Sequence, residues 1–166
     1  MKICLLGSWH AQKAAECKKE AEEIGKELAE RGHILVSGGG IGISKIVVDS
    51  YKKNKGKQFI AYFPSEKMMK KVGEEKGPMP DKLIETKVDY PERNLIMMRD
   101  CDAIIALHGG LGAIAEIIHA TKDYHMKVSV IDKGELAEWV RAIKPLKEKV
   151  FITNDIKKAI KHLGVK

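Results

Sequence analysis

Cysteine is scarce in this sequence, and the few cysteines present follow no pairing or metal-binding pattern. The 166 residues contain Cys4, Cys17 and Cys101, an odd number without a Cys-x-x-Cys spacing. Disulfide frameworks and structural zinc sites need such patterns. The histidines at positions 108, 119 and 125 show no metal-ligand spacing with Cys101 either. We therefore expect reduced, mostly buried thiols and no metal site.

Long hydrophobic runs are also missing. No stretch approaches the roughly 20 apolar residues that a membrane-spanning helix needs. The first residues enter a short apolar segment directly, without the charged lead and cleavage site of a secretory signal. These absences predict a soluble, cytoplasmic protein without a membrane partner.

Aromatic residues make up only 5% of the chain, which matters because the formal net charge is +7. A basic protein can bind nucleic acid, but single strands are usually held by aromatic side chains combined with cations. Here the lysines are spread over presumed helix faces and the C-terminal segment. We interpret these lysines as a solvated surface. Binding of single-stranded DNA is therefore a weaker hypothesis than the two functions described below.

Two common nucleotide-binding motifs are absent. The P-loop ends in Gly-Lys-Ser or Gly-Lys-Thr, and neither tripeptide occurs. The dinucleotide fingerprint would need a third glycine at position 43, after Gly38 and Gly40, but Ile43 stands there. P-loop nucleotide hydrolysis and dinucleotide binding are therefore disfavoured.

The sequence does contain a regular alternation of short apolar runs with longer helical patterns. The apolar runs predict strands at residues 2–6, 33–37, 58–63, 82–88, 102–107, 127–131 and 150–153. Apolar spacing and helix-ending residues predict helices at 11–31, from the second glycine turn to about 51, from Pro91, from about 111, at 134–143 before Pro145, and from 154 or 155 to 164. We interpret residues 65–80 as a partly helical, mobile excursion. This rhythm is typical of an α/β, Rossmann-like, doubly wound and mostly parallel sheet of about seven strands, in a single nucleotide-binding domain over residues 1–166.

Three of the expected strands end in glycine turns. These turns contain Gly7 and Ser8; Gly38, Gly39, Gly40 and Gly42; and His108, Gly109, Gly110, Leu111, Gly112 and Ala113. Because the carboxyl ends of parallel strands share one edge of a sheet, we expect the turns to line that edge together. The third turn opens a helix, whose free N–H groups and dipole suit an anion, most simply a phosphate.

Two charged residues flank the third turn. Arg93 lies near the start of the preceding helix, and Glu116 lies four residues after Gly112. We expect both side chains to reach one crevice at the sheet edge. Taken singly, each residue can have a structural role instead of a role in a ligand site. Arg93 can pair with a neighbouring acid, and Glu116 can be an acid favoured by the helix dipole. His108 can be a ligand-binding group, or equally a histidine at a strand end that is hydrogen-bonded to backbone.

Together, these residues resemble the LONELY GUY (LOG), or lysine decarboxylase-like, family, a group that includes molybdenum cofactor carrier proteins. The family pattern is Arg-Lys, a Met three residues on, Asp-Ala before an apolar strand, and Pro-Gly-Gly-x-Gly-Thr-x-x-Glu. It appears here without insertion or deletion as Arg93-Asn94, Met97, Asp102-Ala103 and the run from His108 to Glu116. The upstream glycine turns also resemble those of the family, so the likeness spans residues 1 to about 131.

The resemblance implies a Rossmann-like fold and, as in the LOG enzymes, removal of the base from a nucleoside 5′-monophosphate. Gly109, Gly110 and Gly112 would cradle the phosphate, while Arg93 and Glu116 would act on the N-glycosidic bond. No cofactor would be required, and the bound ligand would be a nucleoside monophosphate, phosphate or a pterin-type cofactor. Family members assemble as dimers or higher oligomers, and we expect a homo-oligomer here.

Three departures from the family pattern keep a second function open. His108, Ala113 and Asn94 stand where the family has Pro, Thr and Lys. Loss of the Thr removes a hydroxyl that would bond a phosphate at the helix start. The alternative is therefore a non-catalytic protein that binds or carries a nucleotide or a molybdopterin-type cofactor.

Overall fold

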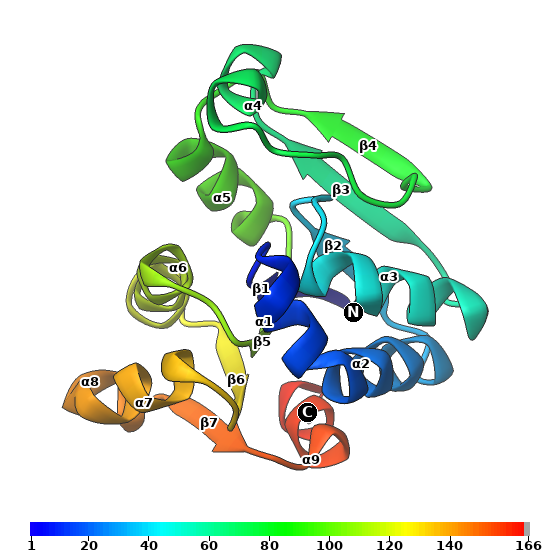
Figure 1. The fold of residues 1–166 in the computed structure, drawn as a ribbon. Coiled ribbons are helices and arrows are strands. Elements are labelled where there is room, and N and C mark those ends of the chain that lie inside the picture. The colour runs from blue at the N-terminus through cyan, green and yellow to red at the C-terminus, as the bar shows by residue number, and fades with distance from the viewer. Residues whose placement is uncertain (165–166) are drawn as a thin grey trace.

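The structure, a computed structural model, describes residues 1–164 and is built around one seven-stranded sheet (Figure 1). All the strands run parallel, in the spatial order β4-β3-β2-β1-β5-β6-β7. They span Lys2–Gly7 (β1), Ile34–Ser37 (β2), Phe59–Phe63 (β3), Lys82–Glu85 (β4), Ala103–Leu107 (β5), Lys127–Ile131 (β6) and Val150–Thr153 (β7). The expected α/β, Rossmann-like sheet is confirmed.

Helices cover both faces of the sheet (Figure 1). One face carries α1 (Ala11–Glu16), α2 (Lys18–Glu30), α3 (Ile43–Lys53) and α9 (Ile156–Gly164). The other carries α5 (Tyr90–Arg99), α6 (Leu111–Lys122), α7 (Glu135–Ala142) and α8 (Lys144–Lys147). Because side chains alternate along a strand, the central strands place side chains against the helices on both faces of the sheet. All five residues of β3 and of β5 are accordingly buried. Two apolar cores therefore lie back to back across the sheet.

The order of the strands reverses at β1. From β1 the chain moves outwards through β2, β3 and β4, then returns to place β5 on the other side of β1. In open parallel sheets, such a reversal leaves a crevice at the carboxyl ends of the central strands. The three glycine turns follow β1, β2 and β5, the strands that meet at this point.

One expected helix is interrupted in the structure. The helix expected at 11–31 is divided at Cys17, whose N–H bonds Ala14 O (3.3 Å) and so leaves the α-helical pattern. Cys17 is buried at this break. The expected stop before Pro145 is confirmed, because α7 ends at Ala142. The short helix α8 then begins at Lys144, and Pro145 is tolerated in its first turn, where the missing N–H needs no partner.

The edge strand is also shorter than expected. β4 ends at Glu85 rather than at residue 88, because it has a single neighbour and Thr86 instead donates backbone and side-chain hydrogen bonds to Phe63 O. The excursion at 65–80 is partly helical, as expected: α4 spans Glu66–Val72. Its mobility stays a prediction.

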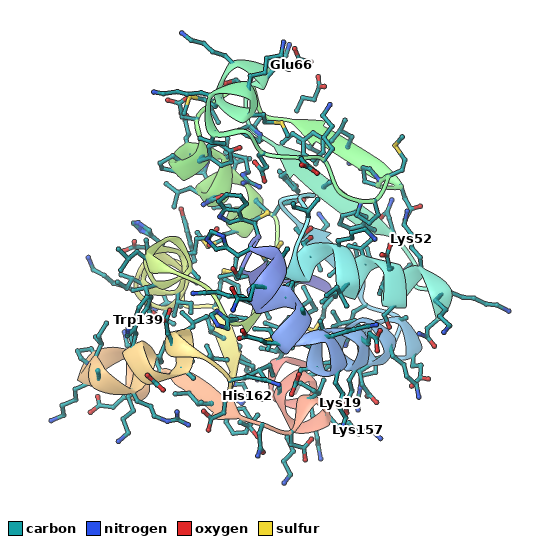
Figure 2. The ribbon with its side chains drawn as sticks, in the orientation of Figure 1. Lys19, Lys52, Glu66, Trp139, Lys157 and His162 are labelled. Carbon is teal, nitrogen blue, oxygen red and sulfur yellow. The ribbon has the colours of Figure 1, made fainter. Side chains whose placement is uncertain are left out.

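The surface lysines belong to separate helices. Figure 2 labels Lys19 on α2, Lys52 on α3 and Lys157 on α9. Such a distribution fits a solvated surface better than one polyanion-binding stripe. Over residues 1–164, no helix has the length and apolar character that crossing a membrane requires.

The contact between α2 and α3 yields a stability prediction. A Cβ on Gly25 would lie 2.3 Å from Val47 O, which is backbone and cannot move aside. Gly25→Ala should therefore lower the free energy of unfolding by about 1–3 kcal/mol, although alanine is the better helix former.

Chemical denaturation would measure this change. Gly112→Ala is the control, since a Cβ there meets no atom within 4 Å and should leave stability unchanged or slightly increased. A Gly25→Ala protein as stable as the wild type would show that the two helices can separate at little cost.

Candidate functional site

A cavity of about 500 Å³ lies where the three glycine turns meet. Its lining includes Gly7 and Ser8 at the end of β1, Gly38 and Gly40 after β2, and Gly110 after β5. The volume is within the range of small-molecule sites, roughly 300–1,000 Å³. The structure thus brings the three turns together at one edge of the sheet.

The first two turns are packed against each other. Ile43 N–H donates to Ser8 O (3.0 Å), and a Cβ on Gly42 would lie 2.5 Å from that same oxygen. Gly42 also has φ 77°, a left-handed conformation that favours glycine. Below them, Ser37 Oγ hydrogen-bonds Ser44 Oγ (2.8 Å) and accepts from Gly39 N–H (3.1 Å). The backbone of this part of the cavity is therefore fixed by hydrogen bonds.

The third turn presents open backbone at the start of α6. Added Cβ atoms on Gly110 or Gly112 would meet nothing within 4 Å, so a ligand can approach closely. The first N–H groups of a helix have no partner within the helix, and the dipole is positive there. Ala113, the next residue of α6, also lines the cavity. This end of the cavity suits an anion.

His108 faces away from this opening. Its Nδ1 accepts a hydrogen bond from Gly109 N–H (2.8 Å), and its ring lies against Gly134. Burial, with a smaller contribution from the charge of Lys13, lowers the pKa of His108, so the ring is neutral at pH 7. Of the two alternatives left open by the sequence, the structure shows the histidine bonded to backbone.

Arg93 is held in place on α5 by its surroundings. The residue is only 6% exposed, its Nη1 donates to Tyr62 O (2.9 Å), and its guanidinium carbon lies 5.3 Å from the centre of the Tyr90 ring. A Cβ on Gly38 would be 2.3 Å from Nη1, so the glycine makes room for the cation. Among residues 1–164, Arg93 forms no ion pair with an acid, and its buried Nε has no hydrogen-bond partner. A buried donor of this kind is expected to meet a ligand.

Glu116 lines the same cavity from the second turn of α6. Burial raises its pKa to about 7, and the positive charge of Arg93 opposes that rise only in part. The two groups are therefore close enough to interact electrostatically, and the carboxyl changes charge near neutral pH. Such a pKa is suited to proton transfer.

The remaining predicted site residues lie around the cavity without lining it. Five residues belong to the turns but do not contribute to the cavity wall: Gly39, Gly42, His108, Gly109 and Leu111. Leu111 is 78% exposed. The binding role given to each residue of the three turns stays a prediction.

Sequence reasoning missed several lining residues. Trp9 and His10 directly follow the first turn and Lys13 lies in α1 just after them, so their position beside a predicted ligand-binding turn was a usable signal. Glu74 and Tyr90 also line the cavity. No local pattern marks Glu74, because tertiary contacts bring it in.

Within residues 1–164, no three His, Cys, Asp or Glu side chains gather in a way that could hold a metal ion.

Comparisons with known proteins agree with this architecture. The sequence model of the SLOG cluster4 family matches residues 1–160. An uncharacterized protein of Archaeoglobus fulgidus is 32% identical over 114 residues, which cover 66% of this chain and 70% of that protein. The cytokinin riboside 5′-monophosphate phosphoribohydrolase LOG of Oryza sativa subsp. japonica is 34% identical over 119 residues, covering 70% of this chain and 47% of the rice protein. The match thus spans about half the length of the plant relative.

A solved structure shows the same fold. The molybdenum cofactor binding protein from Rippkaea orientalis superimposes with a TM-score of 0.79 at 24% identity, covering 96% of this chain and 93% of that one. At this level of identity the likeness establishes the arrangement of the elements.

The raised pKa of Glu116 predicts how stability depends on pH. The carboxyl titrates near 4.5 when unfolded and near 7 when folded, so its protonated form stabilises the folded state. This stabilisation is complete below about pH 4.5 and is lost progressively as the pH rises to 7. Glu116→Gln removes this titration. Between pH 4.5 and 7, the free energy of unfolding of the variant should therefore rise by roughly 3 kcal/mol relative to that of the wild type, and above pH 7 the difference should stay constant.

Urea denaturation at pH 4 to 9 would measure the difference. Glu66→Gln, an exposed change on α4 (Figure 2), is the control and should follow the wild type at every pH. A constant difference between Glu116→Gln and wild type would mean that the Glu116 pKa is ordinary in the folded protein.

Proposed function

The chain belongs to the SLOG cluster4 family, and from that premise we propose that it is a LOG-like phosphoribohydrolase. It removes the base from a nucleoside 5′-monophosphate and releases free base and ribose 5-phosphate. The rice relative carries this activity in its name, for cytokinin riboside 5′-monophosphates. The observation that carries the proposal is that a buried arginine and a carboxyl of raised pKa line one cavity beside an open helix start.

The start of α6 receives the phosphate in this proposal. The N–H groups of Leu111, Gly112 and Ala113 precede the first bond of the helix, which Ile114 N–H makes to Gly110 O (3.2 Å). They are donors for phosphate oxygens, and the helix dipole favours the negative charge. With the phosphate there, the ribose extends towards Glu116 and Arg93, further along the cavity.

Arg93 and Glu116 then act on the N-glycosidic bond. Ionised Glu116 takes a proton from a water molecule while the water oxygen attacks C1′. Alternatively, Glu116 holds the ribose hydroxyls while positive charge develops on the ribose ring. The bond between C1′ and the base breaks, and its electrons leave with the base. The base then takes up a proton from solvent, and Glu116 returns its proton to solvent. Arg93 stabilises the negative charge that develops on the departing base. Because Arg93 is already buried and fixed, little reorganisation accompanies this step.

A second function, non-catalytic carriage of a nucleotide or molybdopterin-type cofactor, has its own support. Ala113 lacks the hydroxyl that the enzyme family places at the helix start, and proteins of the same fold are described as molybdenum cofactor carriers or binding proteins. A carrier would use the same cavity without turnover. The expected homo-oligomeric assembly stays a prediction for either function.

Base release distinguishes the two functions. Incubation of the wild-type protein with a panel of purine nucleoside 5′-monophosphates should yield free base, detected by chromatography. Glu116→Gln should lower kcat by about 10²–10⁴-fold, as expected for loss of a general base, while still binding the nucleotide. Binding by the wild type without base release from any of the monophosphates would instead support a carrier.

The pH profile gives a second measurement on the same reaction. The rate constant kcat/KM should rise with pH and level off above an inflection near 7, because Glu116 must be ionised and its pKa is about 7. The substrate phosphate ionises at about pH 6 and produces its own inflection. The inflection near 7 should therefore vanish from the residual activity of Glu116→Gln. If it persists there, another group is the base.

A further inference from the structure

The cavity has a second polar wall, opposite in character to its phosphate end. After α4 the chain folds back over the second glycine turn, where Gly77 N–H donates to Gly39 O (2.8 Å) and Lys76 forms an antiparallel bridge with Gly40. This brings the Glu74 carboxyl against the turn: a Cβ on Gly40 would lie 2.9 Å from Glu74 Oε1. The contact places a carboxylate from a distant segment in the cavity wall.

The Glu74 carboxylate is held from one side only. Tyr90 Oη donates a hydrogen bond to Glu74 Oε2, and the Tyr90 ring is itself covered by the guanidinium of Arg93. Burial and the bond to Glu74 raise the pKa of Tyr90, so the hydroxyl remains a donor. No hydrogen bond or ion pair occupies Glu74 Oε1 within residues 1–164. The cavity therefore contains a fixed carboxylate oxygen with free acceptor positions.

The order of the elements places this oxygen beyond the reacting centre. The phosphate end lies above β5, Arg93 touches Gly38 at the end of β2, and Glu74 touches Gly40 two residues further on. A nucleotide whose phosphate is at α6 and whose ribose lies by Arg93 thus extends its base towards Glu74.

Trp9 provides a flat surface in the same cavity. Its ring stacks on His10 with centroids 4.5 Å apart, and 54% of the residue remains exposed. Its backbone packs against Gly42, where a Cβ would lie 2.6 Å from Trp9 Cα, so the loop that presents the ring is fixed. Aromatic faces of this kind stack on heterocyclic bases without distinguishing one from another. Discrimination between bases must then come from polar groups.

Resting on the proposed function, we propose that Glu74 selects a base that presents two neighbouring N–H donors, as guanine does with N1–H and its 2-amino group. An ionised carboxylate has only acceptors, so it fits this edge. Adenine presents the unprotonated N1 at the corresponding place, and two acceptors facing each other repel. Tyr90 acts as a positioning residue, since it fixes the carboxylate through Oε2.

A pterin with a 2-amino-4-oxo ring carries the same pair of donors. The shared chemistry is therefore the donor edge, and GMP and neopterin monophosphate are its two probes. IMP keeps N1–H but lacks the 2-amino group, so it separates the contribution of one donor from that of both.

Binding is measured by calorimetry in the Glu116→Gln background, where hydrolysis does not consume the ligand. GMP and neopterin monophosphate should bind about tenfold or more tightly than AMP, with IMP between them, given that a charge-assisted hydrogen bond is the stronger kind. Adding Glu74→Gln should remove the preference or turn it towards AMP, because an amide offers one donor and one acceptor. Adding Tyr90→Phe should reduce the preference without reversing it.

Glu75→Gln is the matched control. It removes the same charge from the neighbouring, exposed residue and should leave the preference unchanged. Three outcomes would each overturn the proposal. The parent protein could bind GMP and AMP with equal affinity, it could bind neither GMP nor neopterin monophosphate, or Glu74→Gln and Glu75→Gln could have equal effects.

Base release by the wild-type protein separates this inference from the proposed function. Preference for GMP without turnover would retain the role of Glu74 and reject the hydrolase. Turnover of GMP and AMP with equal kcat/KM would retain the hydrolase and reject the role of Glu74.

Discussion

The parallel pairing of β1 between β2 and β5 is the constraint on which the site depends. Cys4 is paired with Val36 on one side and with Ile104 on the other, so three strands end together and release their turns at one edge. Each turn then needs a backbone that other elements can approach closely. At Gly7 little space remains, because an added Cβ would lie 2.8 Å from Ile43 Cγ2. A shift of one strand by one residue would exchange buried and exposed side chains and separate the turns.

Burial controls the charges of the site. The positive charge of Arg93 is partly compensated by the Tyr62 carbonyl and by the face of the Tyr90 ring. Glu116 has no such compensation within residues 1–164 beyond the field of Arg93, and its pKa rises accordingly. The same low polarity that makes the carboxyl costly to ionise makes the guanidinium more effective towards negative charge on a ligand.

Much of this arrangement could be predicted from the sequence, because the decisive signals are local. The apolar run before His108, the glycines after it and the spacing from Gly112 to Glu116 each follow from the geometry of one strand or one helix. Glu74 could not be found in this way, since it reaches the cavity through contacts with Gly39 and Gly40, more than thirty residues earlier in the chain. The break at Cys17 was missed because the apolar residues on both sides of it keep a helical spacing, so no local residue type marks the interruption.

In the proposed function, Ala113, which replaces the threonine of the LOG pattern, bears on phosphate affinity more than on hydrolysis itself. A hydroxyl that bonds phosphate contributes about 1.5–3 kcal/mol, as do other hydrogen bonds to a charged group. The backbone donors of α6, its dipole and the open approach at Gly110 and Gly112 do not depend on that side chain. Arg93 and Glu116 lie further along the cavity and make no contact that the hydroxyl would be needed to support. In the proposed hydrolase, a weaker phosphate contact would leave Arg93 and Glu116 in place, and a larger share of ligand selection would fall to the end of the cavity proposed for the base.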